Sequence, residues 1–212
     1  MPVRHVLVLG AAGLTGRHVV TQALAQGHVV TAFVRDPGAM TLTSDRLRVI
    51  TGDVTSDDPA LASAVRGQDA VISALGRGKS FRSGGLIAKS VPRIIHAMES
   101  EGVRRLIFTS AFGIGETYRD TPWLPRLFIG TLLRGIYRDK EAGEVALRSS
   151  ALDWTLVYPS GLVDAPATGR YRAGVRLSLR GFPTVPRADV AAFLLTQITD
   201  TAFVRAGVLI SA

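Results

Sequence analysis

The heptapeptide GAAGLTG at residues 10–16 decides the fold of this chain. It follows the apolar run VLVL at 6–9, which predicts a buried strand, and it opens a helical pattern. Gly10 lets the chain turn sharply out of the strand, Gly13 lets a phosphate approach the backbone, and Gly16 lets the helix pack close to the sheet. Free N–H groups in the first turn of the helix then bind the phosphates. The order of strand, glycine turn and helix predicts a dinucleotide site, with an ordinary tight turn as the alternative.

The composition fits one globular domain spanning residues 1–212, with 47% hydrophobic and 20% charged residues. The apolar runs are too short to span a membrane and the N-terminus has no leader pattern, so we expect a cytoplasmic protein without a membrane partner. The absence of cysteine excludes disulfides, thiolate catalysis and cysteine metal sites. The four histidines, His5, His18, His28 and His96, lack the i, i+4 spacing of a metal-binding pair, so no metal is expected.

The formal net charge of +8 arises from 25 basic residues against 17 acidic ones. The arginines are scattered along the chain, and no block of like charge forms a basic arm. This pattern favours an arginine-rich surface that also attracts an anionic cofactor over a surface that binds nucleic acid. We therefore expect a small-molecule substrate and no nucleic-acid partner, while the oligomeric state stays open.

Strand-like apolar runs alternate with helical patterns through the first two thirds of the chain. Several runs are apolar throughout, as expected where helices cover both faces of a parallel sheet. Gly27 and Gly102 follow two of the helical patterns as C-terminal caps. This alternation predicts an α/β, doubly wound parallel sheet of the Rossmann type. The expected strands are 6–9, 29–34, 47–51, 70–75, 105–109 and 153–158, and the expected helices are 14–26, 58–66, 84–101 and 131–150.

The last third of the chain predicts a small C-terminal region on the substrate side of the sheet. Residues 170–180 have an extended or hairpin pattern, residues 187–199 a helical pattern with an apolar face, and residues 207–211 the pattern of a closing strand. The segment 112–131 is rich in glycine, proline and aromatic residues, so it is either a loop near the ligand or a simple surface connection.

The second strand ends in FVRDP, residues 33–37, which bears on the choice of dinucleotide. An acid at this place binds the ribose hydroxyls of NAD, whereas an arginine meets the 2′-phosphate of NADP. Arg35 follows the apolar run directly, so its guanidinium favours NADPH over NADH, although Asp36 comes next. Arg17, in the first turn of the first helix, is a second candidate for a phosphate contact. The alternative is that Arg35 is a solvated loop residue.

The next two strands end in residues suited to the adenosine part of the cofactor. Asp53 either accepts a hydrogen bond from the adenine amino group, with Val54 against the ring, or caps the local turn. The fourth strand ends in Ala74, Leu75 and Gly76, where small residues let the backbone line the cofactor ribose. Ligands bind at the carboxyl ends of parallel strands, and this is such an end.

The fifth and sixth strands supply the residues that we expect nearest the nicotinamide. Ser110 either hydrogen-bonds the substrate or cofactor or simply forms a turn. At the end of the sixth strand, Pro159 fixes the backbone beneath the nicotinamide and Gly161 permits a close approach. Lys140, on the intervening helix, either holds the ribose hydroxyls and lowers a neighbouring pKa or pairs at the surface with Glu144.

Together these stretches resemble the atypical or extended short-chain dehydrogenase/reductase superfamily. More narrowly, the chain resembles its NAD(P)-binding NmrA-like regulators and its flavin (biliverdin IXβ-type) reductases. The resemblance spans residues 3–198. It is carried by the stretches GAAGLTG at 10–16, VRDP at 34–37, GDV at 52–54, AVISALG at 70–76, RLIFTSAFG at 105–113 and LDWTLVYPSGL at 152–162.

The chain departs from the Tyr-x-x-x-Lys motif with which standard members of this superfamily place a phenol and an ammonium on one helix face. Tyr137 lies only three residues before Lys140. If Lys140 keeps the family place, Ile136 occupies the usual position of the tyrosine. The resemblance therefore implies a member that lost the catalytic tyrosine, and such members either reduce acceptors that need little acid assistance or only sense the cofactor.

The resemblance implies three alternative functions. The first is an NADPH-dependent oxidoreductase that passes hydride to a flat conjugated acceptor, such as a flavin or quinone, which takes its proton from water. The second is a non-catalytic NADP-binding sensor of the NmrA type with a protein partner. The third is a sugar-nucleotide or isomerase-type enzyme, against which the short C-terminal third counts. The expected catalytic residues are Ser110 and Lys140, and the expected cofactor-binding residues are Gly10, Ala12, Gly13, Leu14, Thr15, Gly16, Arg35, Asp53, Val54, Ala74, Leu75, Gly76, Ser110, Lys140, Tyr158, Pro159 and Gly161.

Overall fold

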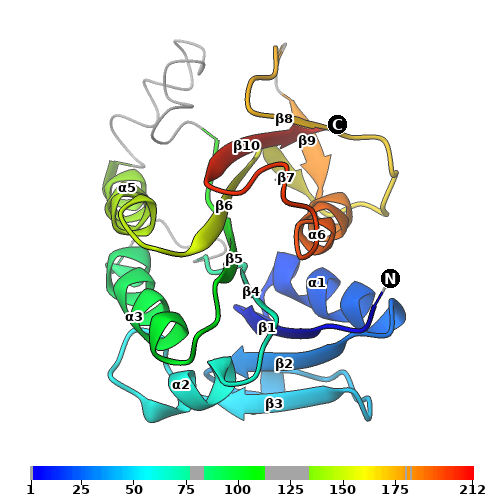
Figure 1. Cartoon of the computed structure of the whole chain (residues 1–212). Helices are drawn as coiled ribbons and strands as arrows, with labels where there is room; N and C mark the ends of the chain where they lie inside the picture. The colour runs from blue at the N-terminus through cyan, green and yellow to red at the C-terminus, as the bar shows by residue number, and fades with distance from the viewer. Residues whose placement is uncertain (1, 77–83, 113–133, 180, 182) are drawn as a thin grey trace.

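The computed structural model describes residues 2–76, 84–112, 134–179, 181 and 183–212, which build layers of helices around an eight-stranded sheet (Figure 1). The strand order is β3-β2-β1-β4-β5-β6-β10-β8, and every neighbouring pair is parallel except β10 with β8. This arrangement confirms the predicted α/β fold of the Rossmann type. The strands of the sheet are β1 (His5–Leu9), β2 (Val29–Val34), β3 (Leu47–Thr51), β4 (Ala70–Ser73), β5 (Arg105–Thr109), β6 (Asp153–Pro159), β8 (Arg172–Gly174) and β10 (Ala206–Ser211).

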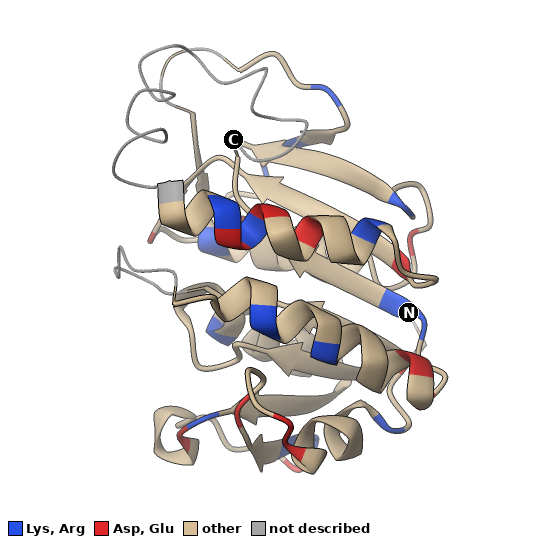
Figure 2. Cartoon of the chain, turned by 90° about the vertical axis from the view of Figure 1, so that its left-hand side faces the viewer, with Lys and Arg blue, Asp and Glu red and all other residues tan. Residues whose placement is uncertain are grey.

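Helices cover both faces of the sheet. On one face α1 (Leu14–Ala25) packs beside α6 (Arg187–Thr196). The other face carries α2 (Pro59–Val65), α3 (Leu86–Ser100) and α5 (Arg134–Arg148), with α3 and α5 side by side. Figure 2 shows basic and acidic residues intermixed along α5. No helix in the described part of the chain is long and apolar enough to cross a bilayer.

The first strand explains why continuous apolar runs predict the strands of this sheet. Leu7 and Leu9 pack in the core under α2, α3 and α5, whereas Val6 and Val8 pack in the core under α1 and α6. All four side chains are fully buried. Because successive side chains point to opposite faces, a strand covered on both faces needs an apolar residue at every position.

The helix ends follow the local signals that predicted them. Gly27 and Gly102 adopt φ of 81° and 72°, the left-handed conformation that ends α1 and α3. Asp58 begins α2, because its carboxylate accepts a hydrogen bond from the amide of Ala60 at 2.8 Å. Of the predicted helix at 131–150, the part that the structure describes begins at Arg134.

In the C-terminal region, the segment 170–180 follows the extended alternative in part. Among its described residues, three form a strand, β8, which pairs antiparallel with β10. The short strands β7 (Gly161–Val163) and β9 (Thr184–Pro186) form a separate parallel pair. The predicted loop at 112–131 lies, apart from Phe112, outside the described residues.

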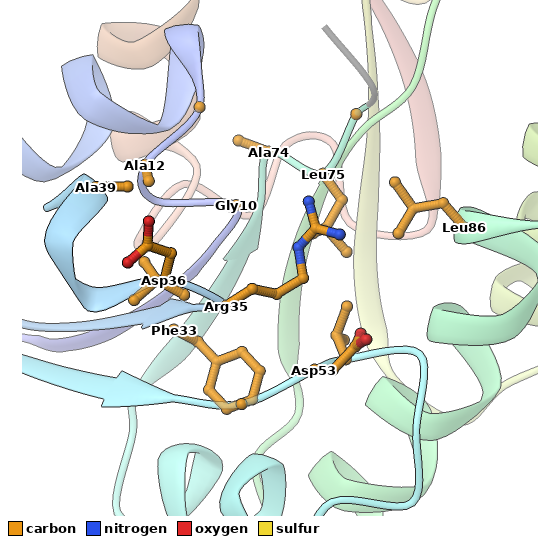
Figure 3. Close-up of a pocket in the computed structure, with 15 residues that line it drawn as sticks. Gly10, Ala12, Phe33, Arg35, Asp36, Ala39, Asp53, Ala74, Leu75 and Leu86 are labelled. Carbon is orange, nitrogen blue, oxygen red and sulfur yellow. The ribbon is translucent and has the colours of Figure 1, made fainter. Parts of the chain in front are cut away.

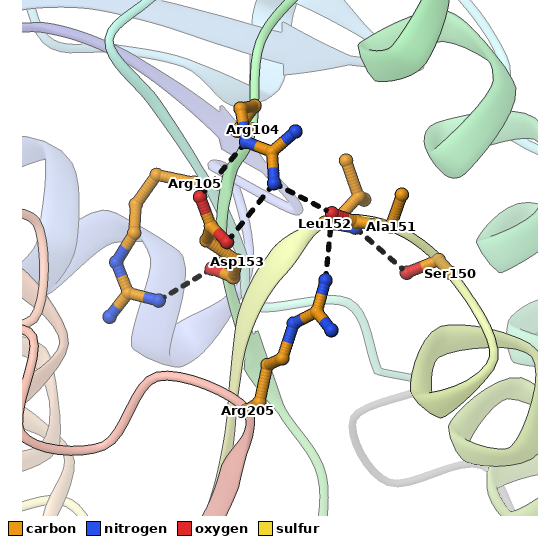
Figure 4. A network of polar contacts seen from close by, with 7 residues as sticks. All are labelled: Arg104, Arg105, Ser150, Ala151, Leu152, Asp153 and Arg205. Atoms are coloured by element: carbon orange, nitrogen blue, oxygen red, sulfur yellow. Dashed lines mark hydrogen bonds and ion pairs between the residues drawn. The ribbon is translucent and has the colours of Figure 1, made fainter.

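An arginine network holds the amino-terminal edge of the sheet, where β5 and β6 begin (Figure 4). Arg104 pairs with the carboxylate of Asp153 at 3.1 Å and donates to the carbonyl oxygen of Ala151 at 3.1 Å. Arg105 donates to the carbonyl oxygens of Asp153, at 2.7 Å, and Gln197, at 2.9 Å. Burial lowers the pKa of Arg105 to about 10, against the attraction of nearby aspartates. These arginines tie β6 and the end of α6 to β5.

Candidate functional site

A cavity of about 310 Å³ opens at the opposite, carboxyl-terminal edge of the sheet (Figure 3). It lies at the carboxyl ends of the paired strands β1 and β4, where the strand order reverses, and sheets of this order bind nucleotides at that point. The residues that line it are Gly10, Ala12, Gly13, Phe33, Val34, Arg35, Asp36, Ala39, Gly52, Asp53, Val54, Ala74, Leu75, Gly76 and Leu86.

Beside this cavity the backbones of three segments lie in close contact: the glycine turn after β1, the first turn of α1 and the segment after β4. Gly10 has a φ of +76°, and a Cβ there would lie 2.8 Å from the carbonyl oxygen of Ala74. A Cβ on Gly16 would lie 2.1 Å from the carbonyl oxygen of Gly10. Neither position has room for a side chain, which is the close packing that the glycine spacing predicts.

The first turn of α1 is open to an anion. Gly13 precedes the helix in an extended conformation, no side chain caps the helix, and its first turn holds no acidic residue. The N–H groups of that turn therefore keep their hydrogen-bonding capacity for a ligand, and the positive end of the helix dipole adds to the attraction. This turn and the adjoining cavity fit the pyrophosphate of a dinucleotide.

The two charged residues after β2, Arg35 and Asp36, have different surroundings. The Asp36 carboxylate accepts a hydrogen bond from the amide of Gly38 at 2.9 Å and caps the short 3₁₀ helix η1 (Pro37–Ala39). The Arg35 side chain instead extends into the cavity beside Leu75 (Figure 3) and makes no hydrogen bond within the described part of the chain. The acid is thus engaged locally, while the guanidinium is available to a phosphate.

Asp53 has a local partner and also lines the cavity. Its carboxylate accepts hydrogen bonds from the amide and the hydroxyl of Thr55, at 2.9 and 2.8 Å. These bonds lower the pKa of Asp53, with a smaller contribution from the charge of Arg35. The turn-capping role is therefore present, and it fixes the carboxylate at the cavity wall beside Val54.

A second group of polar side chains is buried beneath the ends of β5 and β6. The Glu144 carboxylate, only 2% exposed, accepts hydrogen bonds from Ser110 Oγ at 2.5 Å and from the hydroxyl of Tyr158 at 2.7 Å. Arg148 donates to the Tyr158 hydroxyl at 3.2 Å. Burial raises the pKa of Glu144, whereas the two hydroxyl donors and the charges of Arg148 and Lys140 act in the opposite direction.

Asp139 and Lys140, five and four residues before Glu144 on α5, have different surroundings. Asp139 accepts hydrogen bonds from the amides of Ile87 and Ala88, at 3.1 and 2.8 Å, and so caps the N-terminus of α3. Lys140 is half-buried, and burial lowers its pKa to about 8 against the attraction of Glu144 and Asp139. Lys140 is therefore not the exposed surface lysine that the i+4 pairing alternative requires.

The tyrosine before Lys140 is engaged elsewhere. The Tyr137 hydroxyl donates to the carbonyl oxygen of Phe112 at 3.0 Å, and burial raises its pKa. Ile136, at the usual tyrosine position of the superfamily, is half-buried and carries no acid. The described part of this helix therefore places no phenol in the usual location of the proton donor.

The structure brings together about half of the residues expected at the site. Nine line the cavity, and Gly16 supports it from below. Tyr158 differs from expectation, because its hydroxyl is buried against Glu144 instead of facing a ligand. Gly161 also differs, because its amide donates to the carbonyl oxygen of Pro183 at 3.0 Å within the β7–β9 pair. Expected residues outside the cavity lining are Leu14, Thr15, Gly16, Ser110, Lys140, Tyr158, Pro159 and Gly161.

Sequence reasoning missed several lining residues, and it named Ser110 and Tyr158 without the buried Glu144 carboxylate to which both hydroxyls donate. Two of the missed lining residues, Phe33 and Gly52, could have been found from the glycine of the GDV stretch. A Cβ on Gly52 would lie 2.5 Å from the ring of Phe33, so a glycine is required where that ring packs. The sequence signal for the Glu144 cluster is weaker. Gly143, in the middle of α5, lies against Ile87 of α3, and such a glycine marks the packed face of a helix.

Comparison with known proteins agrees with this geometry. The model of a family described as NAD(P)H-binding matches residues 10–201. This chain belongs to the NAD(P)H-binding family. The cofactor that this family binds fits the cavity, because the glycine turn, the open helix end and Arg35 suit its phosphates.

Two solved structures and one curated protein illustrate the similarity. ChuY, described as an anaerobillin reductase from Escherichia coli O157:H7, has a TM-score of 0.80 and 26% identity over 97% of this chain and 96% of its own. A short-chain dehydrogenase/reductase from Veillonella parvula in complex with NADP shares the fold, with a TM-score of 0.79 and 21% identity over 100% and 95% of the two chains. The uncharacterised chloroplastic protein At2g34460 of Arabidopsis thaliana is 30% identical over 183 residues, 78% of this chain. The chain spans 62% of that protein and 31% of the mycobacterial steroid dehydrogenases that it also matches.

Proposed function

We propose that this protein is an NADPH-dependent reductase that passes hydride to a flat conjugated acceptor such as a flavin or quinone. The observation that carries the cofactor choice is the pair at the end of β2. Asp36 is engaged as a cap, while Arg35 extends into the cavity without a hydrogen-bond partner among the described residues. A guanidinium in this place suits the 2′-phosphate that distinguishes NADPH from NADH.

The edge of the sheet suggests how the cofactor is held. The first turn of α1 binds the pyrophosphate, and Arg35 binds the 2′-phosphate. Asp53 and Val54 lie beside the adenine position on the cavity wall. The nicotinamide then lies toward the ends of β5 and β6, near Ser110. The bound cofactor supplies the hydride, and the chain supplies orientation and electrostatic stabilisation.

The class of acceptor is supported by two observations. The phenol that standard members of the superfamily use as acid is absent from its usual place, which disfavours a carbonyl acceptor that depends on that phenol. ChuY, at 26% identity over nearly the whole chain, is described as a reductase of anaerobillin. That likeness supports reduction for the present chain.

The cofactor choice is tested by titrating purified Arg35→Ala with NADPH and with NADH. We expect the Kd for NADPH to rise about 10-fold to 100-fold, the loss of a charge-assisted phosphate contact, and the Kd for NADH to change less than about threefold. Arg48→Ala removes an exposed arginine on neighbouring β3 that does not line the cavity, so both affinities should remain those of the wild type. An equal loss for both cofactors in Arg35→Ala would contradict the assignment.

The alternative is a non-catalytic NADP-binding sensor, and the occupied Tyr137 hydroxyl is the observation in its favour. Oxidation of NADPH, followed by its absorbance with added FMN or a quinone, separates the two. Turnover supports the reductase. Tight NADPH binding without oxidation by any flavin, quinone or tetrapyrrole acceptor favours the sensor.

A further inference from the structure

The buried Glu144 cluster lies between the helix layer and the strand ends near which the acceptor would bind. Ser110 directly follows β5, Tyr158 lies on the neighbouring strand β6, and both hydroxyls donate to the same carboxylate on α5. Glu144 and Tyr158 are nearly inaccessible to solvent, and Ser110 is only 4% exposed. A carboxylate in this environment has lost most of its hydration, so a proton on it is favoured by its surroundings.

The position of Ser110 connects this cluster to the ligand edge. Its amide donates to the carbonyl oxygen of Val157 at 2.8 Å, which fixes the residue one step beyond the end of β5. The adjacent strand, β4, leads directly into Ala74, Leu75 and Gly76, which line the cavity. Because β4 and β5 are parallel, their carboxyl ends share one edge, so Ser110 lies at that edge while its hydroxyl bonds Glu144.

We propose that Glu144, acting through the hydroxyl of Ser110, donates the proton that completes reduction of the acceptor. The inference rests on the proposed reductase function and deepens it, because it names a proton source in place of the absent tyrosine. Ser110 touches the acceptor and is the catalytic residue, whereas Glu144 acts through Ser110 as its proton reservoir.

The transfer balances in protons and electrons. The acceptor gains a hydride from the bound cofactor and thereby a negative charge. The O–H bond of Ser110 breaks as its proton passes to the acceptor. The O–H bond of Glu144 breaks as its proton passes to Ser110 Oγ across the hydrogen bond that joins these two oxygens, which lie 2.5 Å apart. Glu144 is left as a carboxylate and regains a proton from water before the next cycle, so one hydride and one proton reach the acceptor per NADPH.

The charged groups around Glu144 suit the carboxylate that this step produces. On α5 itself, Lys140 and Arg148 stabilise the negative charge, and from β6 the hydroxyl of Tyr158 donates to it. From α3, apolar Ile87 and Val91 pack against the neighbouring Gly143. The cationic neighbours keep the charged form accessible while burial favours the protonated form, which is the balance that a donor near neutral pH requires.

The decisive variant is Glu144→Gln, which keeps the volume and a hydrogen-bonding side chain but cannot release a proton. With FMN, a quinone and a linear tetrapyrrole as acceptors, kcat should fall about 100-fold, while the Kd for NADPH stays within about twofold. Wild-type kcat should decline as pH rises through the pKa of Glu144, and the pH profile of Glu144→Gln should lack this decline. Glu141→Gln, the same change at an exposed position one residue along α5 from Lys140, should match the wild type.

A second variant and a second readout keep the test independent of turnover and of folding. Ser110→Ala cuts the path but leaves Glu144 bonded to Tyr158, so it should lose kcat like Glu144→Gln. Infrared titration of the protein without cofactor should show a protonated carboxyl that persists above the ordinary pKa range of glutamate and is missing from Glu144→Gln. In Tyr158→Phe that titration should move to higher pH, because a hydrogen bond to the carboxylate form is lost.

The outcomes separate this inference from the function on which it rests. If wild-type protein binds NADPH but reduces no acceptor, the reductase proposal fails, whatever the infrared titration shows. If the wild type turns over and Glu144→Gln keeps both its kcat and its pH profile, the relay is wrong and Glu144 is a structural anchor. If Glu144→Gln does not fold, full activity of a folded Ser110→Ala overturns the relay equally.

Discussion

The two edges of the sheet use arginine for opposite purposes. At the amino-terminal edge, Arg105 donates to the carbonyl oxygens of Asp153 and Gln197 and to the hydroxyl of Thr155, and it holds strands and helix together. At the carboxyl-terminal edge, Arg35 extends into a cavity without such a partner in the described part of the chain. The difference teaches that the net positive charge of the chain does not have a single role. Arginine stabilises the fold at one edge of the sheet and is available to a ligand at the other.

The largest effect is expected at the glycine turn of the ligand edge. Gly16→Ala places a Cβ 2.1 Å from the carbonyl oxygen of Gly10, so α1 must move away from β1. We expect a loss of about 2–4 kcal/mol in the free energy of unfolding and no stabilisation of the remaining fold by NADPH. Thermal unfolding with and without NADPH measures both quantities.

The control for this prediction is Gly76→Ala. A Cβ there meets no atom within 4 Å, so its cost in stability should be within about 0.5 kcal/mol. Equal stability of the two variants would show that α1 and β1 are not packed as tightly as the structure has them.

The second effect, at the opposite edge, concerns stability alone. Arg105→Met keeps much of the buried volume but leaves two carbonyl oxygens and the Thr155 hydroxyl without their donor. We expect unfolding to become about 2–3 kcal/mol easier, measured by urea denaturation, with an unchanged Kd for NADPH. Arg104→Met, at a more exposed neighbour, should cost less than about 1 kcal/mol. A weakened Kd in folded Arg105→Met would break the contrast between the two edges.

The ligand edge was the more predictable of the two because its signals are local. The glycine turn, Arg35 and Asp53 each follow a predicted strand, and the geometry of parallel sheets brings such ends together without further information. The alternation of strands and helices likewise depends on short-range patterns of apolar residues, and it predicted the fold. Among the strands predicted in the first two thirds of the chain, only boundaries differ, as at β4, which ends at Ser73, two residues earlier than expected.

The Glu144 cluster could not be predicted because its contacts join distant parts of the chain. Glu144 lies 34 residues from Ser110, and Asp139 lies 52 residues from the amide of Ile87 that it caps. On a helix wheel, both acids belong to a polar pattern that suits solvent, so only the packing of α5 on α3 and β5 shows that they are buried. Tyr158 was assigned to the cofactor for the same reason, since a residue at a strand end faces either the ligand or the helix layer.

The smallest effect concerns Lys140, which lies between the cluster and solvent. Its pKa of about 8 in the folded protein is below that of the unfolded chain, because burial disfavours the ammonium. Between pH 8 and the ordinary lysine range, the unfolded chain holds a proton that the folded protein has released, so stability attributable to Lys140 rises with pH in this window. We expect wild type to gain about 1 kcal/mol relative to Lys140→Met as the pH is raised from 7.5 to about 9.5 in urea denaturation. A parallel pH course for the two proteins would mean that Lys140 is hydrated like a surface lysine, and water would then screen its attraction for the Glu144 carboxylate.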